Sequence, residues 1–183
     1  MIASLEALHC LIATLKSLAP DIVPIGHISA VEPERISELP HITVSAAEID
    51  EAPIGIGGVL LLITSTRGKT SKSTGVSADM TLLIDVLAKS KSKVDDISEK
   101  VTGLLFDNRV SLRRSGFIIF SIKRIGEIVS TGIPKTKAAS LAVWKRRLEY
   151  RCVYEQVLTV TEVPKRIIGK SRISIAKGNQ LDG

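Results

Sequence analysis

Residues 143–160 read VWKRRLEYRCVYEQVLTV, the longest stretch of the chain in which apolar and polar side chains alternate. In an extended strand, one face would pack on a core and the other would meet water or a partner. A helix would mix the two sets, because a period of two does not form a stripe on a helix. The positions predicted to face the core are Trp144, Leu148, Tyr150, Cys152, Tyr154, Leu158 and Val160.

The length of this strand is unusual. At about 3.3 Å per residue the 18 residues would extend roughly 60 Å, whereas a common strand has about five or six residues. We therefore expect that the strand either bends midway or projects its charged end from the body as half of a ribbon.

The composition suits one domain with an aliphatic core. The chain has 183 residues, of which 44% are hydrophobic and only 3% aromatic, so stacking platforms for single-stranded nucleic acid are scarce. The most apolar run, residues 54–63, contains three glycines and is too short to cross a bilayer. The N-terminus lacks the basic start of a secretory signal, and Cys10 and Cys152 suit reduced core thiols. These features predict a soluble protein made in the cytoplasm, with no membrane partner.

The charge is unevenly distributed along the chain. Residues 1–58 carry a net charge of −6 and the remainder +12, although the whole chain carries only +6. Such a split suits a nucleic-acid-binding protein, and it equally suits a subunit whose acidic side meets the basic side of an identical neighbour.

The N-terminal region predicts one helix and a surface excursion. Residues 2–19 repeat leucine and isoleucine at the i, i+3, i+4 spacing of an amphipathic helix, which Pro20 ends. Residues 21–40 are rich in proline and acids, and we expect one short strand there, at 22–28.

The middle of the chain predicts a β-hairpin followed by a helix. Apolar strands are expected at 41–46, 59–64 and 78–88, and residues 65–77 would form a long basic loop at the hairpin tip. A helix would open at Ser92, whose hydroxyl would cap the amide of Asp95. Its buried stripe would be Val94, Ile97, Val101, Leu104 and Leu105.

The last third predicts the strands that flank 143–160. Residues 109–116 would form a basic turn, and 116–131 one bent strand or a strand pair broken at Gly126. The flanking strands would pair antiparallel with 143–160. The whole is an α+β fold, an antiparallel or mixed sheet with two helices on one face. Residues 1–163 form its single domain, and 164–183 are a C-terminal arm that either adds a strand to another chain or frays.

No motif for catalysis or ligand binding withstands inspection. Gly68-Lys69-Thr70 resembles the end of a phosphate-binding loop, but the required glycine five positions before Gly68 is Ile63, and no helix pattern follows. The histidines lack metal-ligand spacing, and no serine lies in a nucleophile elbow. We expect a protein that is not an enzyme, with no catalytic residue, cofactor or metal.

Charged residues remain as candidates for an assembly surface. They are either solvated positions that keep the protein soluble or, repeated around a ring, the lining of a channel. The candidate assembly or channel contacts are Arg67, Lys69, Lys72, Lys145, Arg147, Glu149 and Arg151. The candidate acidic partner surface is Glu32, Glu34, Glu38, Glu48, Asp50 and Glu51.

The order of these segments resembles a known family. An amphipathic N-terminal helix and strands are followed by the strand-to-helix unit DMTLLIDVLAKSKSKVDDISEKVTGLL, residues 79–105, and by the late strand WKRRLEYRCVYE, residues 144–155. Over most of residues 1–160 this pattern is similar to the tail terminator and related neck proteins of tailed bacteriophages.

The resemblance implies a subunit that closes into a ring, typically a hexamer, at the head-proximal end of the tail. Such a ring ends growth of the tail tube, joins the head connector and, in contractile phages, meets the last sheath ring. DNA would pass through it without sequence specificity, and the protein would belong to the virion and assemble in the bacterial host cytoplasm. Residues 65–77 would dock at the ring edge or tube, and residues 145–151 would contact a neighbouring subunit or line the channel.

Two other functions remain open. One is a basic nucleic-acid-binding protein that acts as a monomer or dimer, although a helix-turn-helix, zinc or aromatic-sheet signature is missing. The other is a component of another phage junction, such as head completion or the baseplate. The charge split favours a head-to-tail ring, in which each subunit shows complementary surfaces to its two neighbours.

Overall fold

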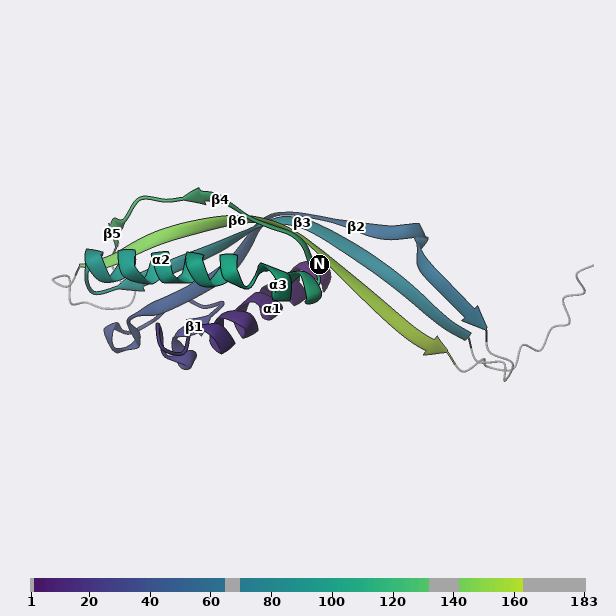
Figure 1. The fold of residues 1–183 in the computed structure, drawn as a ribbon, viewed down its shortest axis with the longest axis horizontal. Coiled ribbons are helices and arrows are strands. Elements are labelled where there is room, and N and C mark those ends of the chain that lie inside the picture. The colour runs from purple at the N-terminus through teal and green to yellow at the C-terminus, as the bar shows by residue number, and fades with distance from the viewer. Residues whose placement is uncertain (1, 65–69, 132–141, 163–183) are drawn as a thin grey trace, which may run out of the picture.

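A six-stranded mixed sheet carries the helices of the protein on one face (Figure 1). The computed structural model of the chain describes residues 2–64, 70–131 and 142–162. The strand order is β1-β2-β3-β6-β4, and β5 pairs with β6 beyond the end of β4. The strands are β1 (Ile28–Ser29), β2 (His41–Thr64), β3 (Thr70–Ala88), β4 (Phe117–Ile125), β5 (Val129–Thr131) and β6 (Val143–Glu162). The predicted α+β class is confirmed.

Strand β6 is the organising element that its alternation predicted. It pairs antiparallel with β3 on one side and with β4 and β5 on the other. Leu148, Tyr150, Cys152 and Tyr154 are at most 6% exposed, so this part of the apolar face lies in the core as expected. The side chains of Leu158 and Val160, which were also predicted to face the core, lie outside the description. The predicted break at Gly126 lies between β4 and β5, where the Gly126 amide donates to the Arg147 carbonyl.

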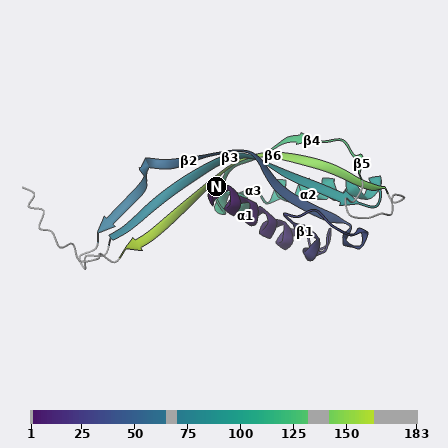
Figure 2. The same ribbon diagram turned by 180° about the vertical axis from the view of Figure 1, so that it is seen from behind.

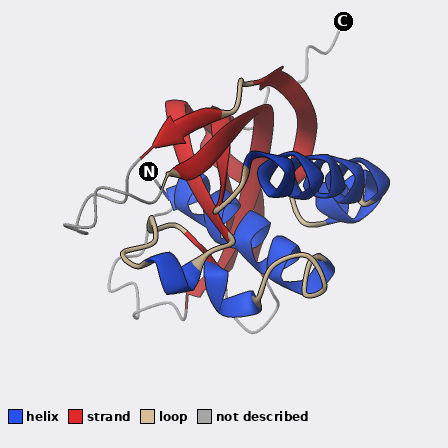
Figure 3. Cartoon of the chain, turned by 90° about the vertical axis from the view of Figure 1, so that its left-hand side faces the viewer, coloured by secondary structure: helices blue, strands red, loops and turns tan. Residues whose placement is uncertain are grey.

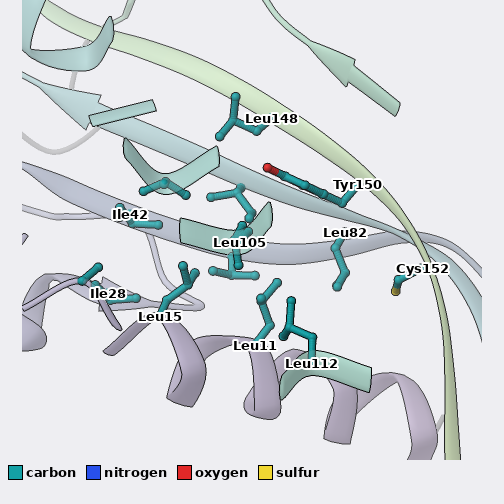
Figure 4. Close-up of a cluster of buried hydrophobic side chains, with 14 of the residues drawn as sticks. Leu11, Leu15, Ile28, Ile42, Leu82, Leu105, Leu112, Leu148, Tyr150 and Cys152 are labelled. Atoms are coloured by element: carbon teal, nitrogen blue, oxygen red, sulfur yellow. The ribbon is translucent and has the colours of Figure 1, made fainter. Parts of the chain in front are cut away.

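Three helices pack on the face that receives these side chains (Figure 3). They are α1 (Ile2–Leu18), α2 (Lys91–Asp107) and α3 (Arg109–Arg114). Leu11 and Leu15 of α1 point towards Leu82 and Ile42 of the sheet, which explains the leucine spacing of the N-terminal segment (Figure 4). Four residues of the predicted α2 stripe are buried and Leu104 packs against the cluster.

The structure corrects three local predictions. The N-cap of α2 is Ser90 and not Ser92, because β3 ends at Ala88 and the Ser90 backbone is still extended; its hydroxyl accepts from the Lys93 amide at 3.3 Å. The predicted turn at 109–116 is the helix α3, which Leu112 anchors in the core. The predicted strand at 22–28 is mostly a 3₁₀ turn (η1, Ile25–His27), and the strand β1 begins at its last residue.

Beyond the helices, the three long strands continue as a ribbon that we call the arm, residues 52–64, 70–77 and 155–162 (Figures 1 and 2). A ribbon does project, but the prediction chose the wrong end of β6: the charged residues 145–151 lie on the body, and residues 155–162 belong to the arm. The predicted long loop at 65–77 is wrong, because Thr70–Ser77 belongs to β3 and is paired with β2 and β6 on its two sides. The two strands expected at 41–46 and 59–64 are one strand with register shifts. Residues 65–69 and 164–183, including the predicted C-terminal arm, lie outside the described residues.

Among the described residues, the sheet face opposite α1 and α2, which we call the outer face, is covered only at one end. There the segment that contains η2 (Ile36–Glu38) packs Leu39 and Ile36 on Leu87 and Val143. In the part of the chain that the structure describes, no helix combines the length and apolarity that a bilayer crossing needs.

Candidate assembly surfaces

The outer face carries a ladder of ion pairs centred on Asp85. This residue lies directly across from Arg147, which binds it through two hydrogen bonds of 2.8 and 2.9 Å. The Lys145 ammonium lies 2.7 Å from Asp85 Oδ2 and 2.9 Å from Glu32 Oε1. The Asp85 side chain is only 6% exposed, so the carboxylate is both buried and fully paired.

The electrostatics fix the ionisation of this cluster. Burial disfavours the charged Asp85, but the hydrogen bonds and charges of Arg147 and Lys145 outweigh it and hold the pKa of Asp85 below its ordinary value. Burial likewise opposes the charge of Lys145, and Asp85 and Glu32 raise its pKa above the ordinary value. The cluster is therefore ionised at neutral pH and acts as a clamp between β3 and β6, not as an acid or base.

Two further ion pairs follow along the same face. Arg151 contacts Asp79 at 2.9 Å, and both side chains are about half exposed. Glu48 accepts from Thr81 Oγ1 at 2.6 Å and from Lys123 Nζ at 2.7 Å. Glu48 has a φ of 51° at the β2 bulge, where the extra residue turns its side chain over the sheet.

The structure thus places many of the candidate charges in contacts within one chain. Lys145, Arg147 and Arg151 pair with Glu32, Asp85 and Asp79, and Glu149 lies beside them on β6, opposite Leu83. The acidic N-terminal segment and the basic remainder meet at the Glu32–Lys145 and Glu48–Lys123 pairs. The role of these residues as assembly contacts stays a prediction.

The other candidates are dispersed. Arg67 and Lys69 lie outside the described residues, and Lys72 lies on β3 opposite Leu62, with no description of its side chain. Glu38 Oε2 accepts from the Glu34 amide at 2.9 Å.

The acidic residues on β2 lie near the root of the arm. Asp50 lies on β2 opposite Asp79. Glu51 Oε1 accepts from the amide and hydroxyl of Ser4, which ties the start of α1 to β2.

A surface that the sequence patterns did not indicate lies along β4. We call it the β4 surface. Strand β4 is paired only with β6, so its other edge is free within the described residues. Its apolar side chains and those of the nearby helices are 41–64% exposed; they are Ile118, Ile119, Ile122, Ile125, Phe106 and Val110.

A groove runs between α2–α3 and β4 on this surface. Its α2 end is also lined by Asp95, which pairs with Arg146, and by Glu99. Three pockets of about 440, 290 and 520 Å³ lie along this groove. The first and second pockets share the lining residue Thr102, and the second and third share Arg109 and Phe120. The rings of Phe120 and Tyr150, which both line the second pocket, stack with their centroids 4.8 Å apart. Burial raises the pKa of Tyr150, and a hydrogen bond with the Thr102 side chain opposes this rise.

The opposite edge of the sheet carries a second apolar surface, which we call the β2 surface. Strand β1 pairs with β2 only at Ile42 and Thr43, so the following residues of β2 form an edge of the described sheet. Ile49 is 47% and Leu5 of α1 54% exposed. A pocket of about 270 Å³ between them is lined by Leu8, Val44 and Ala46, among others.

These two surfaces differ in charge. Residues 109–125, which include α3 and β4, contain five basic residues and no acid: Arg109, Arg113, Arg114, Lys123 and Arg124. Residues 44–53 of β2 contain three acids and no base: Glu48, Asp50 and Glu51. The sequence analysis found the charge split but not its location, because strand order is needed to see that these segments lie on opposite edges.

The described residues contain no group of three or more histidine, cysteine, aspartate or glutamate residues that would hold a metal ion. The rings of His27 and His41 stack at 6.1 Å, and burial lowers the pKa of His41. Cys10 and Cys152 are free thiols, and burial raises the pKa of Cys152 to about 12. No protein-family model matches the chain, and no curated protein is similar to it.

Proposed function

We propose that this chain is a structural subunit of a ring that ends the tail tube of a tailed bacteriophage and joins the tail to the head. The observation that supports an assembly role is the arm. Three strands leave the helix-covered body together, and no helix of the described chain packs on their far half (Figures 1 and 2). This half of the ribbon lacks the helix packing that covers the rest of the sheet, so a partner that docked on it would supply that packing.

The chemistry of the described surface supports the same function. Its most buried carboxylate, Asp85, and the bases around it neutralise one another in a clamp between strands. The apolar surfaces lie at the sheet edges, where a neighbouring protein would cover them. The choice of the phage tail end, and of the tube, sheath and connector as partners, rests on the sequence resemblance.

The paired bases of β6 do not support a dedicated nucleic-acid-binding protein, whereas the arginines of α3 and β4 would suit one. Phosphate binding needs lysine and arginine side chains that are available to the backbone of the nucleic acid. Lys145, Arg147 and Arg151 are instead paired with carboxylates of the same chain. In the proposed ring, DNA passes through without such contacts.

The proposed function is tested by imaging phage particles assembled without this protein. Overlong tails are expected, because the tube would lack its terminator. Tails of normal length attached to heads would contradict the proposal, and tailless heads with tubes of normal length would indicate another neck component instead.

A further inference from the structure

We infer that the β4 surface of one copy receives the β2 surface of the next copy, so that the contact is head to tail. The inference rests on the proposed function, because it names the surfaces that would close the ring. Four features of the described residues support it, namely edge availability, apolar exposure, charge and position.

Both surfaces have the free backbone of an edge strand next to exposed apolar side chains. Strand β4 spans nine residues and is paired on one side only. The β2 edge beyond Thr43 is likewise not covered by β1. An uncovered apolar edge strand pairs readily with another chain unless charge, proline or a bulge protects it.

The protection differs between the two edges. The β2 edge has a bulge between Ala47 and Asp50 and a proline at position 53. The β4 edge has bulges near Ile118 and Lys123 but retains four isoleucines, of which each is more than 40% exposed. The groove beside β4 offers the larger pockets, so the β4 surface acts as the receiver and Ile49 and Leu5 as the inserted side chains.

Charge decides which surfaces meet. If two β4 surfaces met, Arg109, Arg113 and Arg124 of both copies would lie in the same interface. If two β2 surfaces met, Asp50 and Glu51 of both copies would do so. Like charges in an interface are costly, whereas a β4 surface against a β2 surface brings bases to acids.

Lys123 and Glu48 already pair within the chain, but the remaining charges keep this complementarity. Within residues 109–125, four arginines remain, and on β2 Asp50 remains.

The positions of the surfaces then determine the type of assembly. The two surfaces lie on opposite edges of one sheet, so a contact between them uses different patches on the two copies. Such a heterologous contact leaves one free surface at each end of a dimer, and growth stops only when a ring closes.

The test uses two single variants of the full chain, measured by size-exclusion chromatography with light scattering. Ile122→Asp disables the β4 surface and Ile49→Asp the β2 surface; both side chains are 44–47% exposed, so folding should persist. Each variant alone is expected to be a monomer. An equimolar mixture should form a dimer of twice the 19.7 kDa chain mass and nothing larger, since it contains one intact contact.

Ile25→Asp is the matched control, because Ile25 of η1 is 54% exposed and belongs to neither surface nor to the arm. It should assemble as the wild type does. Arg113→Glu, on the surface of α3, provides a second β4 variant with less risk to folding; it should weaken assembly at least about tenfold, and circular dichroism should show an unchanged helix signal.

The outcomes separate the two proposals. A wild-type chain that stays monomeric would overturn the ring itself. A wild-type ring together with rings from both Ile122→Asp and Ile49→Asp would overturn only the assignment of surfaces. If Ile49→Asp formed dimers by itself and Ile122→Asp formed none, two β4 surfaces would be in contact. This result would also overturn the assignment of surfaces.

Discussion

The body and the arm are built from the same three strands but have different surroundings. In the body, the inner face of β6 packs Leu148 and Tyr150 against α1 and α2, and the outer face is clamped by Asp85. In the arm, β3 still pairs with β2 and β6, but no helix of the described chain packs against the far half of these strands. The buried side chains that stabilise this protein therefore lie in the body, where the helices cover the sheet.

The largest expected difference between the two regions comes from single apolar side chains. Phe117 is fully buried in the body and contacts the rings of Phe120 and Tyr154. We expect Phe117→Ala to lower the free energy of unfolding by about 3–5 kcal/mol. In the arm, Val157→Asp should change it by no more than about 0.5 kcal/mol, because the side chain is 55% exposed.

Urea unfolding followed by circular dichroism measures both changes. Equal losses from the two variants would mean that the arm shares the core of the body, which would remove the distinction between the regions.

The second prediction concerns the clamp on the outer face. Asp85→Asn removes the carboxylate that Lys145 and Arg147 share, and leaves two partly buried cations without it. We expect a loss of about 3 kcal/mol, the lower end for a broken buried pair, because Lys145 keeps Glu32 and Arg147 is 45% exposed.

The matched control is Asp79→Asn, nearer the arm, where Arg151 and Asp79 are both about half exposed. It should cost at most about 1 kcal/mol. A control loss as large as that of Asp85→Asn would show that burial does not distinguish the two pairs.

The third prediction concerns pH. The pKa of Asp85 is lower in the folded chain, so its stabilising contribution is complete above the ordinary value of about 3.9 and is lost as the pH falls through the folded value. The pKa of Lys145 is raised, so its contribution is lost only as the pH rises above the ordinary value of about 10.4. The stability difference between the wild type and Asp85→Asn should therefore be constant from about pH 5 to 8 and shrink below about pH 4.

Unfolding titrations at several pH values measure this difference. A marked change between pH 5 and 8 would show that another group, such as a histidine, controls the clamp.

The smallest expected effect concerns the reactivity of the Cys152 thiol. Burial raises the pKa of Cys152, at the base of the body, to about 12, so almost none of it is thiolate at pH 8. In a Cys10→Ser background, we expect Cys152 to react with a thiol reagent at least about a hundredfold more slowly in the folded than in the unfolded chain. Fast labelling under native conditions would show that the body opens near β6.

The sequence predicted the body better than the surfaces. The alternation of residues 143–160 and the leucine spacing of α1 each depend on one local face. The structure confirms the leucine spacing, and it confirms the alternation from Leu148 to Tyr154. The run of serine and threonine at 70–77 was misjudged as a loop, because pairing with two long neighbours holds it extended, and such pairing is not local. The ion pairs could not be predicted for the same reason, because they join residues such as Glu32 and Lys145 that lie far apart in the sequence.

One local signal was available for the clamp. Asp85 is the single charged residue within the apolar run 80–88, and a buried carboxylate there requires a cationic partner. The β4 surface had no such signal. The isoleucines of FIIFSIKRI suit a buried strand, and only the strand order shows that β4 is an edge.

We propose that this chain assembles head to tail into a closed ring. Light scattering of the purified wild-type protein at low and high salt, with face-on electron micrographs of the same fractions, tests it most directly. We expect rings of one defined mass that dissociate in part as salt screens the arginine–carboxylate contacts. A strict monomer at high protein concentration under every salt condition, including with tail tube present, would contradict it.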